Sequence, residues 1–124
     1  MARLRWMTLR ILYVEDNPLV REVTSELPSQ DERKIVALGT AEEALNAFRA
    51  GPFDVVITDI SLPVMSGLDL ARNILTLEPS APIIIASGYV LTSVVQNLGP
   101  KVRTIVKPFE AFQIDSLIHE LCAA

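Results

Sequence analysis

Short apolar runs alternate along this chain with segments in which apolar residues recur every three or four positions. The apolar runs span residues 10–14, 34–38, 55–57, 83–86 and 102–106 and predict five buried strands. Ile83-Ile84-Ile85-Ala86 is continuously apolar, which is typical of a strand covered on both faces. Because strands and helices alternate, the pattern predicts an α/β fold, a five-stranded parallel sheet with right-handed crossovers and helices on both faces.

The first two helices carry clear boundary signals. Asn17 is a candidate N-cap, Pro18 suits the first helical position, and Pro28-Ser29-Gln30 breaks the helix that carries Val20, Val23 and Leu27. Thr40-Ala41-Glu42-Glu43 has the capping-box pattern and predicts the start of the second helix, which Gly51-Pro52 ends.

Three further helical segments follow in the second half of the chain. The helix after Gly67 presents an apolar face made of Leu68, Ala71, Ile74 and Leu75. A short helix is predicted between Leu91 and Leu98. The last helix is expected to bury Phe112, Leu117, Ile118 and Leu121.

Length and composition restrict the class of protein. The chain has 124 residues, half of them hydrophobic, which suits one domain with a substantial core. A net charge of -4 argues against a nucleic-acid-binding surface, and no apolar run approaches the length of a membrane span. Residues 1–9 are basic without an apolar segment, so we expect an N-terminal tail there and a single domain over residues 10–124. The single cysteine, Cys122, fits a reducing compartment, and we expect a cytoplasmic protein.

Polar side chains stand at the ends of four predicted strands: Glu15-Asp16, Asp59, Ser87 and Lys107. The carboxyl ends of parallel strands lie at one edge of the sheet, so these groups should converge there. Three clustered carboxylates repel one another unless a cation neutralises them, and such an all-oxygen site suits magnesium (Mg2+). A lysine and a hydroxyl beside that cation could bind phosphate oxygens, so the sequence predicts phosphoryl transfer.

These strand ends resemble the motifs of the receiver domain of two-component response regulators, including the chemotaxis regulator. Tyr13-Val14-Glu15-Asp16-Asn17 is similar to the acidic-pair motif, and the segment from Val56 to Gly67 is similar to the phosphoacceptor motif. Ile85-Ala86-Ser87-Gly88 resembles the switch-hydroxyl motif, and Val106-Lys107-Pro108-Phe109 the lysine-proline motif. The resemblance runs from about Leu9 to the C-terminus. It implies a flavodoxin-like (βα)5 fold with strand order 2-1-3-4-5.

The resemblance implies that Asp59 accepts a phosphoryl group from the phosphohistidine of a sensor histidine kinase or phosphotransfer protein. Asp16, Asp59 and the backbone carbonyl of Ser61 would bind magnesium directly, and Glu15 would bind it through a water molecule. Such a domain signals by changing conformation and catalyses only its own phosphorylation and dephosphorylation, so it is not an ordinary enzyme. The resemblance does not identify the output partner, and it leaves homodimerisation open.

Further roles follow from the same resemblance. Lys107 would pair with Asp59 and then with its phosphate, and Ser87 would move to bind that phosphate. Pro108 would follow a cis peptide bond.

The chain departs from the usual receiver pattern near the switch hydroxyl. Gly88 stands where alanine is common, and Thr104 stands where the family usually has an aromatic switch residue. Ser61 and Tyr89 would flank the phosphate and influence its lifetime. We expect Tyr89, in the loop after Gly88, to take over the reporting role of the absent aromatic. The segment from Ser87 to Lys107 is short for the family, so its helix should be short too.

Three other functions fit the sequence less well. A phosphatase of the haloacid dehalogenase type needs a second aspartate two residues after its nucleophile, where this chain has Ser61. A flavodoxin-like flavin binder would hold phosphate in its first loop, where Glu15 and Asp16 would repel it. A pseudo-receiver that only binds partners does not need the full set of acids, hydroxyl and lysine. Both a standalone regulator and a receiver taken from a hybrid kinase or multidomain regulator stay open.

Overall fold

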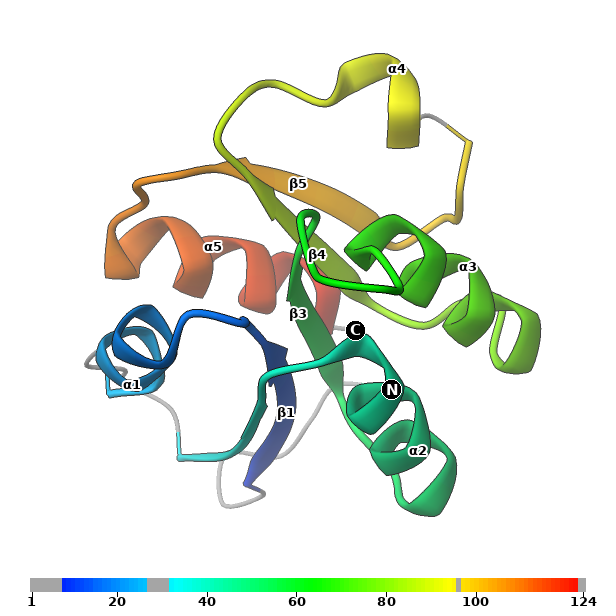
Figure 1. Cartoon of the computed structure of the whole chain (residues 1–124), viewed down its shortest axis with the longest axis horizontal. Coiled ribbons are helices and arrows are strands. Elements are labelled where there is room, and N and C mark those ends of the chain that lie inside the picture. The colour runs from blue at the N-terminus through cyan, green and yellow to red at the C-terminus, as the bar shows by residue number, and fades with distance from the viewer. Residues whose placement is uncertain (1–7, 27–31, 96, 123–124) are drawn as a thin grey trace.

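The structure, a computed structural model, describes residues 8–26, 32–95 and 97–122. Within these residues, strands and helices alternate as predicted (Figure 1). The strands are β1 (Leu9–Val14), β2 (Arg33–Leu38), β3 (Val55–Asp59), β4 (Ile83–Ser87) and β5 (Val102–Val106). The helices are α1 (Pro18–Ser25), α2 (Ala41–Ala50), α3 (Gly67–Leu77), α4 (Thr92–Val95) and α5 (Ala111–Cys122).

The strands form one parallel sheet in the order β2-β1-β3-β4-β5, which confirms the predicted α/β fold and its flavodoxin-like strand order. β1 already includes Leu9, whose Cα is paired with that of Arg33 on β2. Thr8 of the predicted N-terminal tail is described and exposed, and residues 1–7 lie outside the described residues. The boundary at residue 10 therefore stays a prediction.

Each face of the sheet supports its own hydrophobic core, because successive strand residues point to opposite faces. Residues such as Leu12, Val56 and Ile85 face α2 and α3. Their neighbours Ile11 and Ile57 face α5 on the other side. Figure 1 shows α2 and α3 on one side of the sheet and α1 and α5 on the other.

The cap residues behave as the sequence predicts. Asn17 caps α1 by accepting hydrogen bonds from the backbone of Leu19 and Val20 at 3.0 and 3.2 Å. Thr40 caps α2, where its hydroxyl accepts from the backbone nitrogen of Glu43 at 3.2 Å. These contacts satisfy N–H groups that have no partner within the helix.

The last helix buries a different face from the one predicted at its start. Phe112 was expected in the core, but it is 68% exposed, and Ile114 is buried in its place. The buried positions of α5 are Ile114, Ile118 and Leu121, which recur at helical spacing, and Phe112 lies two residues off this series. Burial of Ile118 and Leu121 is confirmed, and Leu117 is partly buried against the same core.

Helix α1 is less embedded than α2, α3 and α5, and helix α4 is short. No residue of α1 is buried, and Val23 is 64% exposed although it falls at helical spacing. Leu27, the third predicted apolar position of this helix, lies outside the described residues. Helix α4 covers only Thr92–Val95 of the predicted segment from Leu91 to Leu98, which confirms that it is short. Asn97 then adopts a left-handed backbone with φ 65°, which does not continue a helix.

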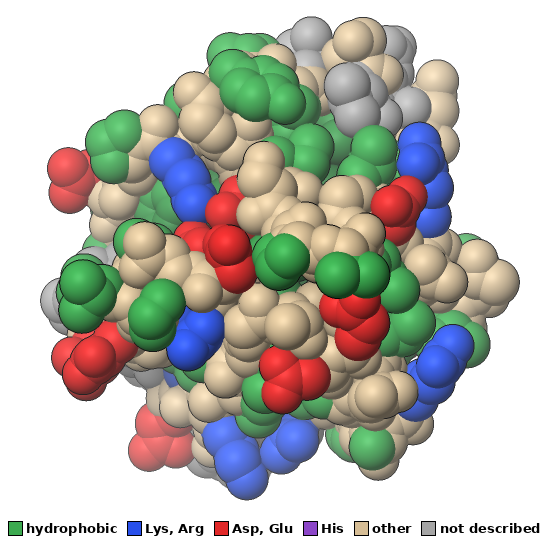
Figure 2. All heavy atoms as spheres, viewed as in Figure 1, with side chains coloured by type: hydrophobic (Ala, Val, Ile, Leu, Met, Phe, Trp, Pro, Cys, Tyr) green, Lys and Arg blue, Asp and Glu red, His purple; other side chains and the backbone are tan. Residues whose placement is uncertain are grey.

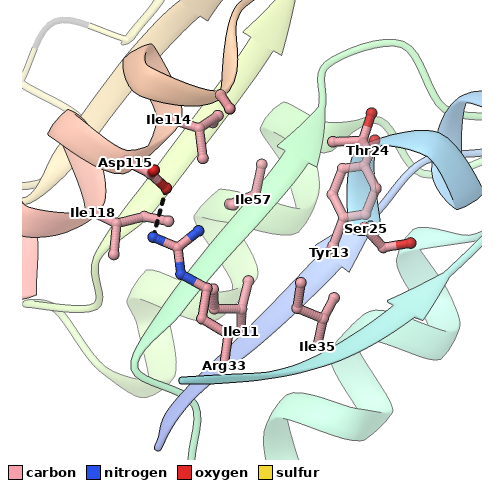
Figure 3. A pocket seen from close by; sticks show the side chains of 11 residues that line it. Ile11, Tyr13, Thr24, Ser25, Arg33, Ile35, Ile57, Ile114, Asp115 and Ile118 are labelled. Atoms are coloured by element: carbon pink, nitrogen blue, oxygen red, sulfur yellow. Dashed lines mark ion pairs between the residues drawn. The ribbon is translucent and has the colours of Figure 1, made fainter. Parts of the chain in front are cut away.

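Helices α1 and α5 enclose a small cavity of about 30 Å³ above β1, β2 and β3 (Figure 3). An ion pair lies at one side of the cavity, where Arg33 Nη2 of β2 is 2.7 Å from Asp115 Oδ1 of α5. Thr24 and Ser25 of α1 line the other side (Figure 3). The Arg33–Asp115 ion pair therefore connects the edge strand β2 directly to α5, and α1 takes no part in it.

Candidate functional site

The polar strand ends meet at the carboxyl edge of the sheet, as predicted. Asp59 ends β3, Ser87 ends β4, and Lys107 directly follows β5. Glu15 and Asp16 directly follow β1. One carboxylate oxygen from each of Glu15, Asp16 and Asp59 lies within 4.8 Å of the others. Parallel strand direction thus gathers residues that are more than 90 positions apart in the chain.

Lys107 holds two of the three carboxylates. Its Nζ donates to Glu15 Oε1 at 2.9 Å and to Asp59 Oδ2 at 3.0 Å. Burial lowers the pKa of the Lys107 ammonium, but the hydrogen bonds and charges of Glu15 and Asp59 outweigh it, so this pKa lies above its ordinary value of 10.5. The lysine therefore stays charged at neutral pH and offsets part of the negative charge of the site.

The three acids differ in exposure. Glu15 is only 2% exposed, and its second oxygen, Oε2, accepts from the backbone nitrogen of Asn17 at 3.1 Å. Asp59 is partly buried, whereas Asp16 is exposed. Glu15 is thus fixed by protein partners, while Asp16 offers its carboxylate to solvent. Oxygen ligands of this kind, few in number and open to water, fit magnesium, which keeps several of its waters.

The loop after β3 approaches Asp59 closely because residue 67 is glycine. A Cβ at this position would overlap the carbonyl oxygen of Asp59 and crowd Ile60. The Gly67 nitrogen donates to the Ile60 carbonyl at 2.9 Å, and Ser66 caps α3. Ser61 is exposed, and its backbone nitrogen donates to Asp59 Oδ1 at 3.4 Å. That its carbonyl is a magnesium ligand stays a prediction.

Ser87, the predicted switch residue, is buried at the end of β4, where its carbonyl accepts from the backbone nitrogen of Lys107 at 2.7 Å. Ser87 is 1% exposed, and its Oγ accepts from the backbone nitrogen of Tyr89 at 3.1 Å. The Tyr89 side chain is 63% exposed, so it is not packed into the loop. A Cβ built on Gly88 would meet no atom within 4 Å, which leaves this loop unobstructed. Thr104 is half-buried on β5, where it is paired with Ile85 of β4.

Sequence analysis missed two contacts of the site. Arg21 of α1 donates from Nη1 to the backbone carbonyl of Glu15 at 2.7 Å. The buried Thr58 donates from Oγ1 to the carbonyl of Asp59 at 2.9 Å. Both contacts are made to backbone atoms, for which the sequence carries no pattern. The peptide bond between Lys107 and Pro108 is cis, as the resemblance implied.

Comparison with known proteins agrees with this geometry. Residues 11–119 match the family described as response regulator receiver domain. The chain belongs to this family.

The matched relatives are longer proteins. The response regulator protein FleR of Pseudomonas aeruginosa is 32% identical over 114 residues, which are 90% of this chain and 24% of FleR. The sensor protein TorS of Escherichia coli is 37% identical over 84 residues, which are 67% of this chain and 9% of TorS. The receiver chain thus matches a minor part of each relative.

Solved receiver structures share the fold over nearly the full length of this chain. The response regulator protein TrrA of Thermotoga maritima, solved in complex with Mg2+ and BeF, has a TM-score of 0.80 and 30% identity. The match covers 91% of this receiver and 98% of that chain. None of the described helices of this receiver has the length and apolar character needed to cross a membrane.

Acidic side chains and exposed hydrophobic ones share the face of the receiver seen in Figure 2.

Val64, in the loop between Asp59 and Gly67, is 97% exposed and has a left-handed backbone with φ 69°. A β-branched side chain is strained in this conformation, and an exposed one gains little from packing. The loop that carries the site therefore stores local strain.

We predict that Val64→Asn stabilises the receiver. Asparagine tolerates the left-handed region, so the free energy of unfolding should rise by about 0.5–1 kcal/mol in urea denaturation. Val90→Asn is the matched control, because Val90 is 68% exposed and does not have a positive φ, and it should leave the free energy nearly unchanged. A loss of stability in Val64→Asn would show that the Val64 side chain makes a contact stronger than the strain.

Proposed function

We propose that Asp59 accepts a phosphoryl group from a phosphohistidine, in a magnesium-dependent reaction. The observation that carries this proposal is the bridge from Lys107 Nζ to both Glu15 and Asp59 beside the exposed Asp16. A carboxylate oxygen of Asp59 attacks phosphorus, the bond between phosphorus and the histidine nitrogen breaks, and the imidazole leaves with that electron pair. Phosphoryl transfer of this kind depends on positioning and charge neutralisation.

The charge balance supports a role for a divalent cation. Three carboxylates and one ammonium leave a formal charge of -2 at the site, and an incoming phosphoryl group adds further negative charge. Asp16 and Asp59, with Glu15 acting through a water molecule, would hold magnesium, which would offset this charge. Lys107 would follow Asp59 onto the new phosphate.

Signalling follows from the same chemistry. The proposed reactions are confined to phosphorylation and dephosphorylation of Asp59, so the conformation of the chain is the output. The proposed phosphodonor is a sensor histidine kinase or a histidine phosphotransfer protein in the cytoplasm. The resemblance of the chain to parts of TorS and FleR supports both contexts, a receiver within a sensor kinase and one within a response regulator.

The first prediction concerns the phosphoacceptor. Incubation with magnesium and acetyl phosphate should add one phosphoryl group per chain, measured by intact mass spectrometry, and Asp59→Asn should abolish the addition. Asp69→Asn is the matched control, because Asp69 is an exposed aspartate in the first turn of α3. An acid-labile phosphate mapped to any residue other than Asp59 would contradict the assignment.

The second prediction concerns the metal. Magnesium that binds only the folded receiver should raise its melting temperature, with about 2.7 kcal/mol of stabilisation at 100 times the dissociation constant. Asp16→Ala should remove this rise and, by relieving carboxylate repulsion, raise the melting temperature without metal. Glu78→Ala, an exposed acid at the end of α3, should keep the full magnesium response. The same response in Asp16→Ala would exclude Asp16 from the site.

The third prediction concerns the switch. Because the Tyr89 nitrogen donates to the Ser87 hydroxyl, movement of this hydroxyl toward the phosphate changes the Tyr89 backbone directly. Beryllofluoride, which mimics the phosphoryl group, should shift amide resonances of residues 87–91 more than that of Thr104, and Ser87→Ala should remove the effect at Tyr89. Thr104→Val should keep it. Large shifts centred on Thr104 with an unchanged Tyr89 would show that β5 transmits the signal instead.

A further inference from the structure

The guanidinium of Arg21 connects α1 to the end of β1. Its Nη1 donates to the carbonyl oxygen of Glu15 at 2.7 Å. This carbonyl belongs to the peptide unit that joins Glu15 to Asp16. The orientation of that peptide unit sets the direction in which the exposed Asp16 side chain leaves the backbone.

The other contacts of Glu15 hold its backbone nitrogen and its side chain, but not its carbonyl group. The Glu15 nitrogen donates to the Leu38 carbonyl at 3.0 Å, which continues the pairing of β1 with β2. Its side chain is held by Lys107 and by the backbone nitrogen of Asn17. Nitrogen and side chain are therefore fixed, and Arg21 supplies the contact that fixes the carbonyl.

Gly39 provides the space in which this guanidinium lies. A Cβ at residue 39 would be 2.9 Å from Arg21 Nη1 and 3.8 Å from its Cζ, too close for the present position of Nη1. No glycine among the described residues has a positive φ, so the backbone at Gly39 does not itself require glycine. The absence of a side chain at residue 39 thus leaves room for Arg21 Nη1 in its present position.

Helix α1 depends on polar contacts of this kind. None of its residues is buried, and Leu19 is 73% exposed, so apolar packing contributes little to its position. Thr24, near the end of the helix, lines the same small cavity as Tyr13 of β1. Arg21 attaches the middle of the helix at the point where the acidic pair begins.

We propose that Arg21 is a positioning residue for the magnesium site. By holding the peptide unit between Glu15 and Asp16, it keeps the Asp16 carboxylate directed toward Asp59. The inference rests on the proposed role of Asp16 as a magnesium ligand.

The sign of the effect separates positioning from charge. Arg21 is cationic, so its replacement by a neutral residue would strengthen binding of a cation if electrostatics alone acted. If Arg21 positions Asp16, the same replacement weakens binding. Partners that orient metal ligands typically contribute about 10–100-fold to metal affinity.

The test is a calorimetric magnesium titration of the whole chain. Arg21→Met keeps the aliphatic stem but removes the donor, and it should raise the magnesium dissociation constant about tenfold. Arg21→Lys, which retains a donor, should recover part of the affinity. Arg49→Met, which removes an exposed arginine from the last turn of α2, should leave the dissociation constant unchanged.

Two further readouts separate positioning from general damage. With acetyl phosphate, Arg21→Met should phosphorylate slowly at low magnesium and at the wild-type rate at saturating magnesium. In the metal-free protein, the amide resonance of Asp16 should shift while those of β4 stay in place. A slow rate that saturating magnesium does not restore would overturn the positioning role.

Gly39→Ala tests the contact without altering Arg21. It should weaken magnesium binding in the wild-type background and have no further effect in Arg21→Met, because the two changes act on one contact. It also keeps the proposal testable if Arg21→Met does not fold. An additive effect of the two substitutions would contradict the shared contact.

The outcomes for Arg21 and for the metal site are distinct. Magnesium binding that Asp16→Ala abolishes but Arg21→Met leaves equal or tighter would overturn the positioning role and leave the proposed function intact. Magnesium binding that persists in Asp16→Ala would overturn the proposed metal site, and the positioning role with it.

Discussion

The hydrogen-bonded bridge from Lys107 to Glu15 and Asp59 is the interaction on which the site depends. A carboxylate as buried as that of Glu15 needs a charged or hydrogen-bonding partner, and Lys107 Nζ donates to it. The same ammonium donates a hydrogen bond to Asp59 Oδ2. Strand order makes the bridge possible, because β1, β3 and β5 all end at the same edge of the sheet. Chemistry and topology are therefore linked through one side chain.

The surroundings of the bridge divide into rigid and yielding parts. Gly67 allows the start of α3 to lie against the Asp59 backbone, and the buried Thr58 bonds the same carbonyl. In contrast, the loop that follows Ser87 has open space at Gly88 and an exposed Tyr89. The backbone of Asp59 is therefore closely packed, whereas the loop after Ser87 is open to solvent.

Helix α1 has an intermediate position between these two parts. Its apolar residues are exposed, so local unfolding of this helix costs little buried apolar surface. The Arg21 bond to the Glu15 carbonyl connects this weakly packed helix to the acidic pair. If Arg21 positions Asp16 for magnesium as proposed, binding of the cation and the order of α1 are coupled through the same peptide unit.

The sequence by itself determined the alternation of strands and helices, the strand ends that carry the acids, hydroxyl and lysine, and the caps at Asn17 and Thr40. Local periodicity and capping chemistry are written in neighbouring residues, so they need no tertiary information. The family resemblance supplied the strand order and the cis bond before Pro108. Only the tertiary structure decided that Phe112 is exposed, because the face of α5 that meets the sheet is set by packing. It also decided the hydrogen bond of Arg21 to the Glu15 carbonyl and the space for Arg21 beside Gly39. Both depend on how α1 and the ends of β1 and β2 lie together, which no local sequence pattern encodes.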